Sequence, residues 1–369
     1  MSQTPLVPIA PLLSAAERSA RAGKPAAVGA FNVNFYSQAE GILEGLRRAD
    51  APGIIQASRG ACKFQGGADR IASMLTGAMA DSGHALPVCL HLDHGDVVSA
   101  IHCAQSGFSS VMIDASKLDY AENVATTRVI VEYAHSLGVT VEGEYGKLAG
   151  IEEDIVHETT TYADPTLVPH FFKASGADAL AVAYGTKHGP NKGADISQLA
   201  VHIVRQSYDA MTACGLQNDH FLVSHGSSTV PQELVADICK YGGRFEKPMH
   251  GVPMERLHEA IAGGIRKINI DTDLRLGITA RFREYFASHP GVEQTSEVLA
   301  GIKKALDEKL DAVDPRDYLG GVDKGLLRNS PAGTDLEEVM VSLKEWIAGH
   351  VQFLVEKFGS AGLAGKVEG

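Results

Sequence analysis

The sequence predicts an α/β protein whose fold class is a (β/α)8 barrel with extra C-terminal helices. From about residue 26, short and nearly continuous apolar runs alternate with longer amphipathic stretches, which is typical of parallel strands buried by helices on both faces. Eight such runs can be counted, the number that closes this barrel. Polar and ionisable residues gather at the C-terminal ends of the runs, where barrel strands converge on one mouth. An open doubly wound sheet is the alternative.

Each predicted strand is a short apolar run, and amphipathic segments such as 37–50, 68–83 and 121–138 separate the strands. Beyond the eighth unit, 296–313 and 335–359 have helical patterns. We therefore expect one domain over residues 1–369, with the barrel proper from about 26 to 290 and a helical extension from about 290 to 369. The predicted strands are 26–34, 53–59, 87–95, 109–116, 140–146, 179–185, 221–228 and 266–273.

Composition indicates a folded protein with a small-molecule partner. Hydrophobic residues make up 44% and charged residues 21% of the chain, as in globular proteins. The net charge of −12 disfavours binding to nucleic acid or to an anionic membrane surface. The five cysteines form no C-x-x-C pair, so a reducing cytoplasm fits better than a disulfide framework. We see no signal peptide and no run of about eighteen apolar residues that would span a bilayer.

Three histidines stand in matching places, each after an apolar strand and directly before a glycine. These are His94, His188 and His225. Histidines at separate strand ends of a barrel could hold one metal ion and leave a coordination position open for substrate. Any one of them alone would more often be an ordinary hydrogen-bonded histidine, but three in the same context favour the metal site.

Carboxylates lie close to two of these strand ends. Asp93 directly precedes His94, and it could serve as a general acid or base or could orient a histidine. Glu142 and Glu144 share one face of the fifth strand. Because a buried carboxylate is costly unless it binds a metal or accepts hydrogen bonds, Glu144 is a candidate functional residue.

The segment 147–165 after the fifth strand has little apolar periodicity. A loop of this length in a compact enzyme is usually a lid or an active-site arm. It carries Glu152, Glu153 and Asp154, a charge run that would equally fit solvated surface.

Small and hydroxyl residues follow the seventh and eighth strands, in 225–228 and 269–273. Barrels often hold phosphate at this place, and backbone N–H groups can bind a dianion there without a lysine. Ordinary turn and helix-cap chemistry is the competing interpretation.

With these motifs in view, the chain resembles the class II, metal-dependent fructose-1,6-bisphosphate aldolases from about residue 5 to about residue 320. Tyr145 replaces a usual aliphatic residue, Ala149 replaces a common glycine, and 189–196 is short for the family. Eight motifs in the family's order make the resemblance specific: AFNVN, QASRGA, HLDHGD, VEGEYGKLAGIEED, AYGTKHG, VSHGSS, KINIDTD and DPRDYL.

The resemblance implies an enzyme that reversibly cleaves fructose 1,6-bisphosphate with the help of a bound metal ion, usually Zn²⁺ or another divalent transition metal. The three histidines would hold this ion, and Glu144 would be an additional or alternative ligand. Asp93 would handle the C4 hydroxyl proton, Glu152 would exchange the proton of dihydroxyacetone phosphate, and Asn269 would hold the enediolate. Three further roles are implied. One phosphate would bind to Gly189, Gly226, Ser228, Asp271 and Thr272, and a monovalent cation (Na⁺ or K⁺) would bind to Gly189 and Gly226. The second phosphate and the substrate chain would contact Asn32, Ser58 and Arg316.

Arg316 is expected to act in trans from a neighbouring subunit, which would require a homodimer or homotetramer. A Schiff-base aldolase would need a lysine inside a strand, and the nearest candidate, Lys187, adjoins His188. Tagatose-1,6-bisphosphate cleavage needs the same groups, and a zinc-dependent barrel hydrolase is a more remote alternative, as is a catalytically silent scaffold. Glycolysis, gluconeogenesis and the Calvin cycle all fit the resemblance.

Overall fold

The computed structural model describes residues 6–147, 150–152, 155–157, 160–187, 189 and 199–368, with only the backbone for 150–152 and 155–157. Eight parallel strands form a closed barrel in the order β1-β10-β9-β8-β5-β4-β3-β2. The strands are β1 (Val28–Asn32), β2 (Gly53–Ser58), β3 (Val88–Gly95), β4 (Ser110–Ile113), β5 (Thr140–Tyr145), β8 (Ala179–Val182), β9 (Phe221–Ser224) and β10 (Ile265–Ile270).

The pairing of β1 with β10 closes the barrel and decides between the two predicted folds. Their register runs from Val28 opposite Lys267 to Phe31 opposite Ile270. The prediction of a (β/α)8 barrel with all eight strands is therefore confirmed, and the open doubly wound sheet is wrong. Several strands end before their predicted limits, because residues such as Asp114 and His225 already belong to the loops of the mouth.

Helices cover the outside of the barrel, as the amphipathic segments predicted. Asp96, Asp119 and Ser58 each cap the start of the helix that follows them. The helices are α2 (Tyr36–Arg48), α3 (Arg59–Gln65), α4 (Ala68–Ser82), α5 (Val97–Gln105), α6 (Tyr120–His135), α7 (Val168–Ser175), α8 (Val201–Ala213), α9 (Gln232–Lys240), α10 (Met254–Gly263) and α11 (Thr272–Ser288).

A helix that the sequence analysis did not predict, α1 (Ile9–Arg21), packs at the N-terminal end of the barrel. Its Leu12 and Leu13 are fully buried and join a cluster with residues at the start of the strands, among them Val28 and Phe221. Glu17 of the same helix forms a buried ion pair with Arg266 of β10 at 2.6 Å. This end of the barrel is thus filled by side chains, which leaves the opposite, C-terminal end for the predicted site.

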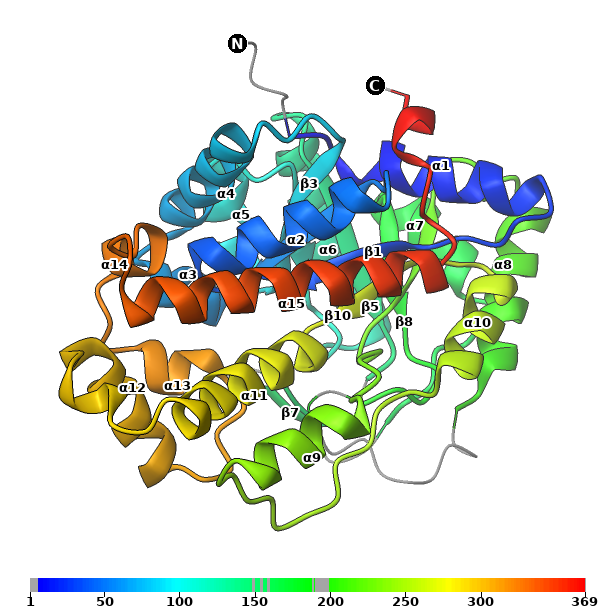
Figure 1. The fold of residues 1–369 in the computed structure, drawn as a ribbon. Helices are drawn as coiled ribbons and strands as arrows, with labels where there is room; N and C mark the ends of the chain where they lie inside the picture. The colour runs from blue at the N-terminus through cyan, green and yellow to red at the C-terminus, as the bar shows by residue number, and fades with distance from the viewer. Residues whose placement is uncertain are drawn as a thin grey trace.

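The C-terminal extension contains two long helices, as predicted, and two short α-helices and two short 3-10 helices that were not. Figure 1 shows α15, in orange to red, running beside α2, in blue, on the outside of the barrel. Gly41 and Gly45 of α2 allow this close packing, because a Cβ atom at either position would collide with Ile347 or Val351. The elements are η2 (Val292–Gln294), α12 (Glu297–Glu308), α13 (Pro315–Leu319), α14 (Lys324–Arg328), α15 (Asp335–Lys357) and η3 (Ala364–Lys366).

The long segment after β5 has backbone structure of its own. Strands β6 (Gly150–Glu152) and β7 (Ile155–His157) form an antiparallel hairpin, and Lys147 bridges Thr161 below it. Among the residues that the structure describes, no helix is both long and apolar enough to cross a membrane.

Candidate active site

Asp93 and His94 reach the centre of the barrel mouth together because the chain bends between them. His94 has a φ of 50°, in the left-handed region that non-glycine residues seldom adopt, and the register of β3 with β4 shifts at this point. Ligand atoms of Asp93, His94 and His225 all lie within 4.8 Å of one another, and all three side chains are buried. The structure thus brings together two of the three predicted histidines and the carboxylate beside them.

The two histidine rings face each other through one nitrogen each. Nδ1 of His225 lies 2.8 Å from Nε2 of His94. The outer nitrogens meet carboxylates: Nδ1 of His94 is 3.2 Å from Asp114, and Nε2 of His225 is 2.7 Å from Glu142. Because each carboxylate accepts an N–H, the inner nitrogens turn their lone pairs toward each other, and this pair could share a proton or serve as two ligands of one metal ion. This donor set fits a divalent transition metal. His188 lies outside the described residues.

A second group of possible metal ligands consists of His94, Asp114 and Glu144, so His94 belongs to both groups. Oε2 of Glu144 has no hydrogen-bond partner among the described residues and lies 3.6 Å from Nδ1 of His94. Burial, together with the charge of Asp114, raises the pKa of Glu144 well above its usual range. Sequence reasoning selected Glu144 but missed Asp114, although Asp114 follows the fourth strand as the other polar residues follow theirs.

The field of this cluster favours positive charge. Burial by itself disfavours the charged form of His94, but Asp114, Asp93 and Glu144 outweigh it and raise the pKa of His94 to about 9. Burial lowers the pKa of His225, against the opposing effect of Glu142. A cation at the inner nitrogens would therefore be stabilised by the surrounding carboxylates.

Asp93 is surrounded by amide groups. Nδ2 of Asn32 lies 2.9 Å from its carboxylate, and Nδ2 of Asn269 and Nε2 of Gln56 each lie at 3.2 Å. Burial opposes ionisation of Asp93, but His94, His225 and Lys267 outweigh it and lower its pKa. The hydrogen bonds described for Asp93 come from amides rather than from a histidine, which favours a proton acceptor over an orienting group. Gln56 was not predicted.

Lys267 corrects one expectation from the sequence. Lys187 is not the nearest candidate for a Schiff base, because Lys267 lies inside strand β10 and is fully buried. Its ammonium group is paired with Glu142, with Nζ 2.8 Å from Oε2.

The predicted phosphate residues lie after β9 and β10, at the start of α11. Oγ of Ser228 accepts hydrogen bonds from the backbone N–H groups of Asp271 and Thr272, at 3.1 Å each. Gly226 has a φ of 60°, and a Cβ atom there would lie 2.5 Å from the carbonyl oxygen of Lys187. Gly189 also adopts a positive φ, of 79°. The backbone at position 226 thus needs glycine, and the hydroxyl of Ser228 already accepts two backbone N–H groups at the start of α11.

The remaining predicted residues are Ser58, Arg316 and the acidic residues of the segment after β5. Ser58 is buried, pairs in register with Asp93 across β2 and β3, and caps α3. Arg316 forms an ion pair with Asp314 of the same chain at 2.6 Å. Arg275 in turn joins Asp314 to Asp271, at 2.7 and 2.6 Å. The side chains of Glu152, Glu153 and Asp154 are not among those described.

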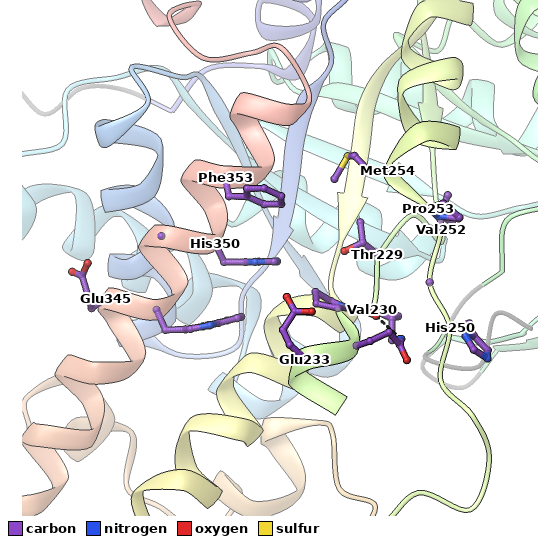
Figure 2. A pocket seen from close by; sticks show the side chains of 15 residues that line it. Thr229, Val230, Glu233, His250, Val252, Pro253, Met254, Glu345, His350 and Phe353 are labelled. Atoms are coloured by element: carbon purple, nitrogen blue, oxygen red, sulfur yellow. Dashed lines mark hydrogen bonds between the residues drawn. The ribbon is translucent and has the colours of Figure 1, made fainter. Parts of the chain in front are cut away.

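A separate cavity of about 750 Å³ lies between α15 and the segment that precedes α10. Figure 2 shows His350 and Phe353 of α15 on one side and Thr229, Val252 and Met254 on the other. None of the predicted site residues lines this cavity.

Comparisons with known proteins agree with the geometry. The family model described as fructose-bisphosphate aldolase class-II matches residues 13–326. The fructose-bisphosphate aldolase of Giardia intestinalis is 38% identical over 341 residues, which cover 92% of this chain and 90% of that protein. The fructose-bisphosphate aldolase of Treponema pallidum is 37% identical over 306 residues, 80% of this chain and 86% of that protein.

Two solved structures share the fold. The YdjI aldolase of Escherichia coli K12 has a TM-score of 0.62 at 23% identity and covers 97% of this chain and 99% of its own. The fructose-bisphosphate aldolase of Campylobacter jejuni has a TM-score of 0.66 at 20% identity and covers 98% and 97%. At these identities the likeness concerns the fold alone.

Proposed function

The chain belongs to the class II fructose-bisphosphate aldolase family, and on this premise we propose that it cleaves fructose 1,6-bisphosphate reversibly to dihydroxyacetone phosphate and glyceraldehyde 3-phosphate. The observation that carries this proposal is the pair of inner imidazole nitrogens of His94 and His225, 2.8 Å apart, beside the carboxylate of Asp93. A cytoplasmic location is part of the proposal and derives from the cysteine pattern.

Class II aldolases are metal-dependent in general, and we assign the metal ligands to Nε2 of His94, Nδ1 of His225 and the imidazole of His188. Glu144 would be an additional or alternative ligand, since its Oε2 is buried close to His94. We propose Zn²⁺ or another divalent transition metal, because imidazoles and carboxylates suit these ions. When bound, such an ion supplies a Lewis acid that polarises the carbonyl group of the ketose.

Asp93 is the proposed acceptor of the C4 hydroxyl proton. Its lowered pKa and its amide neighbours keep the carboxylate ionised and oriented. As C4 becomes an aldehyde, the electron pair of the C3–C4 bond stays with the three-carbon ketone fragment. That fragment then takes a proton at the same carbon, a step that we assign to Glu152 on the hairpin. Asn269, which touches Asp93, would hold the enediolate oxygen.

Phosphate binding is assigned to the loops after β9 and β10. The start of α11 at Thr272 supports this, because a helix N-terminus favours an anion. We propose that a monovalent cation, Na⁺ or K⁺, binds the carbonyl groups of Gly189 and Gly226. The second phosphate would meet Asn32, Ser58 and, from a neighbouring subunit, Arg316, in a homodimer or homotetramer. The residues proposed for the first phosphate are Gly189, Gly226, Ser228, Asp271 and Thr272.

A coupled cleavage assay with fructose 1,6-bisphosphate tests the proposal. Activity should vanish after exhaustive chelation and return with added Zn²⁺, and tagatose 1,6-bisphosphate serves as the comparison substrate. Activity that survives chelation but disappears on borohydride reduction with substrate would replace the metal by a Schiff base, for which Lys267 is the buried lysine to test.

A further inference from the structure

We propose that Glu142 and Lys267 act as a positioning pair that fixes which nitrogen of His225 faces the metal site. The inference rests on the proposed function, because that function assigns His225 as a ligand. Neither Glu142 nor Lys267 was singled out for this role by the sequence, and both are fully buried.

The pair spans the inside of the barrel. Glu142 lies on β5 and Lys267 on β10, and β8 and β9 stand between these two strands in the barrel wall. Even so, Nζ of Lys267 lies 2.8 Å from Oε2 of Glu142. The contact therefore crosses the interior directly below the mouth, and it holds the carboxylate in one orientation.

That orientation aims the second carboxylate oxygen at His225. Oε1 of Glu142 lies 2.7 Å from Nε2 of His225. A carboxylate that is paired with an ammonium group accepts hydrogen bonds and donates none, so Nε2 must carry the hydrogen. A neutral imidazole has a single N–H, and the lone pair is then on Nδ1, the nitrogen that lies 2.8 Å from His94.

Without this acceptor, the ring could carry its hydrogen on either nitrogen or turn about its χ2 angle. His91 is close to Glu142 but could not replace it as the acceptor for His225. Nε2 of His91 lies 3.6 Å from Oε2 of Glu142, on the side away from His225, and Nδ1 of His91 is engaged with Ser110. Glu142 thus supplies the acceptor, and Lys267 supplies the anchor that aims it.

The barrel contains a matched control for this pair. Arg266, the neighbour of Lys267 in β10, forms a buried ion pair with Glu17 at the closed end of the barrel, at 2.6 Å. Both pairs are buried carboxylate–cation contacts that start from the same strand, but the described partners of Glu17 are Arg21, Tyr208 and Arg266, none of which is a proposed ligand. If the loss of any buried ion pair weakened Zn²⁺ binding, removal of either pair should do so. If the positioning of His225 is the cause, only removal of the Glu142–Lys267 pair should weaken Zn²⁺ binding.

The first experiment uses metal-free protein labelled with ¹⁵N in its histidines. Long-range ¹H–¹⁵N correlation spectra, assigned with a His225→Gln variant, report which nitrogen of His225 carries hydrogen. The spectra are recorded at about pH 10, where His94 has lost the second proton that it could otherwise donate to Nδ1 of His225. We expect hydrogen on Nε2 in the wild-type protein and a mixture of forms in the Glu142→Met/Lys267→Met double variant. The double variant is chosen because it leaves no buried charge without its counter-ion, so it should fold.

The second experiment measures Zn²⁺ affinity by competition with a chelator. We expect the double variant to bind roughly 10–100-fold more weakly, the range found for outer-shell partners of metal-binding histidines. Glu142→Gln keeps an acceptor oxygen and should lose less Zn²⁺ affinity than the double variant. The control Glu17→Met/Arg266→Met should bind Zn²⁺ as the wild-type protein does, whatever its melting temperature.

Two results would overturn the inference: wild-type Zn²⁺ affinity in the Glu142→Met/Lys267→Met variant, or an unchanged Nε2–H form of His225 in that variant. If the wild-type protein itself fails to bind Zn²⁺ or another divalent transition metal, the proposed function fails instead. The tautomer measurement on metal-free protein keeps these two failures distinguishable.

Discussion

The barrel mouth and the cavity beside α15 differ in how many buried ionisable groups they bring together. The outer cavity has a volume of about 750 Å³, and the rings of Trp346 and His350 stack along one of its sides with centroids 5.1 Å apart. The mouth instead concentrates buried ionisable groups such as Asp93, His225 and Glu142, each at most 1% exposed. Burying several charges is costly unless they act on one another or on a ligand, so the convergence of buried charge favours the mouth over the outer cavity as the place of the chemistry.

The two regions touch at one loop. Asp273 accepts hydrogen bonds from the backbone N–H groups of Thr229 and Val230, which line the outer cavity, and His350 lies 3.7 Å from the same carboxylate. The loop that carries Ser228 toward the mouth is thus supported from the cavity side. The comparison predicts that changes at the mouth remove catalysis, while changes in the outer cavity act mainly on stability.

The largest effect is expected for His225→Ala. Removing one of the two facing imidazoles should abolish stoichiometric Zn²⁺ binding and detectable cleavage, as metal analysis and the coupled assay would show. His350→Ala in the outer cavity is the matched control and should retain its metal. Stoichiometric Zn²⁺ in the His225→Ala protein would remove this residue from the ligand set.

Asp93→Asn should come next. The amide cannot take the C4 hydroxyl proton, so kcat should fall roughly 10²–10⁴-fold while the metal stays bound. Steady-state kinetics and metal analysis on the same preparation separate these two effects. A kcat within threefold of the wild-type value would show that Asp93 only holds Asn32 and Asn269 in place.

Arg316→Ala should mainly raise KM for the bisphosphate, by about 10–100-fold, as expected for one charge-assisted contact to phosphate. If Arg316 acts in trans, mixing this variant with Asp93→Asn should restore part of the activity in hybrid oligomers. Unchanged kinetics in the single variant would argue against a role for Arg316 in substrate binding.

Glu44 of α2 offers a pH test away from the barrel mouth. Arg48 pairs with both Glu44 and Glu345, and Glu345 lines the outer cavity. The hydrogen bond from Arg47 is the main cause that lowers the pKa of Glu44 to about 2, with burial opposing it. A carboxyl group whose pKa is lower in the folded than in the unfolded protein stabilises the fold at pH values above its pKa in the unfolded protein. This contribution fades as the pH falls from about 4.5 toward about 2.

Glu44→Gln should therefore cost about 1 kcal/mol or less at pH 6, since the pair is partly exposed, and less still at pH 3. Urea unfolding at the two pH values measures the difference, and cleavage activity at pH 7 should not change. A cost that grows toward low pH would have the opposite sign and would contradict the assignment.

The smallest effect is expected for Phe353→Ala. Phe353 is 46% exposed at the outer cavity, so kcat and KM should stay within about twofold and stability should change little. A large loss of activity would show that the outer cavity controls the mouth, and the contrast between the two regions would no longer hold.

The barrel was predictable because parallel strands that are buried on both faces give continuous apolar runs, and eight of them were counted. Helix α1 was not predicted, since only the closed barrel creates the end that Leu12 and Leu13 fill. The short α13 begins at Pro315 after the cap residue Asp314 and has too few residues for a periodic pattern.

The site was predictable where residues follow one another at strand ends, as in His94 and His225. Gln56 and Lys267 were missed because they lie within strands, where the sequence does not tell which face becomes the inside of the barrel. The contact between Lys267 and Glu142 joins two strands that are not neighbours, so it depends on closure and leaves no local pattern.

X-ray absorption at the zinc edge of the Zn²⁺-loaded enzyme tests the central claim most directly. The account predicts a first shell with three imidazole nitrogens at about 2.0–2.1 Å. The His225→Ala protein should lose this signal. Sulfur ligands at about 2.3 Å, or a shell without imidazole, would contradict it.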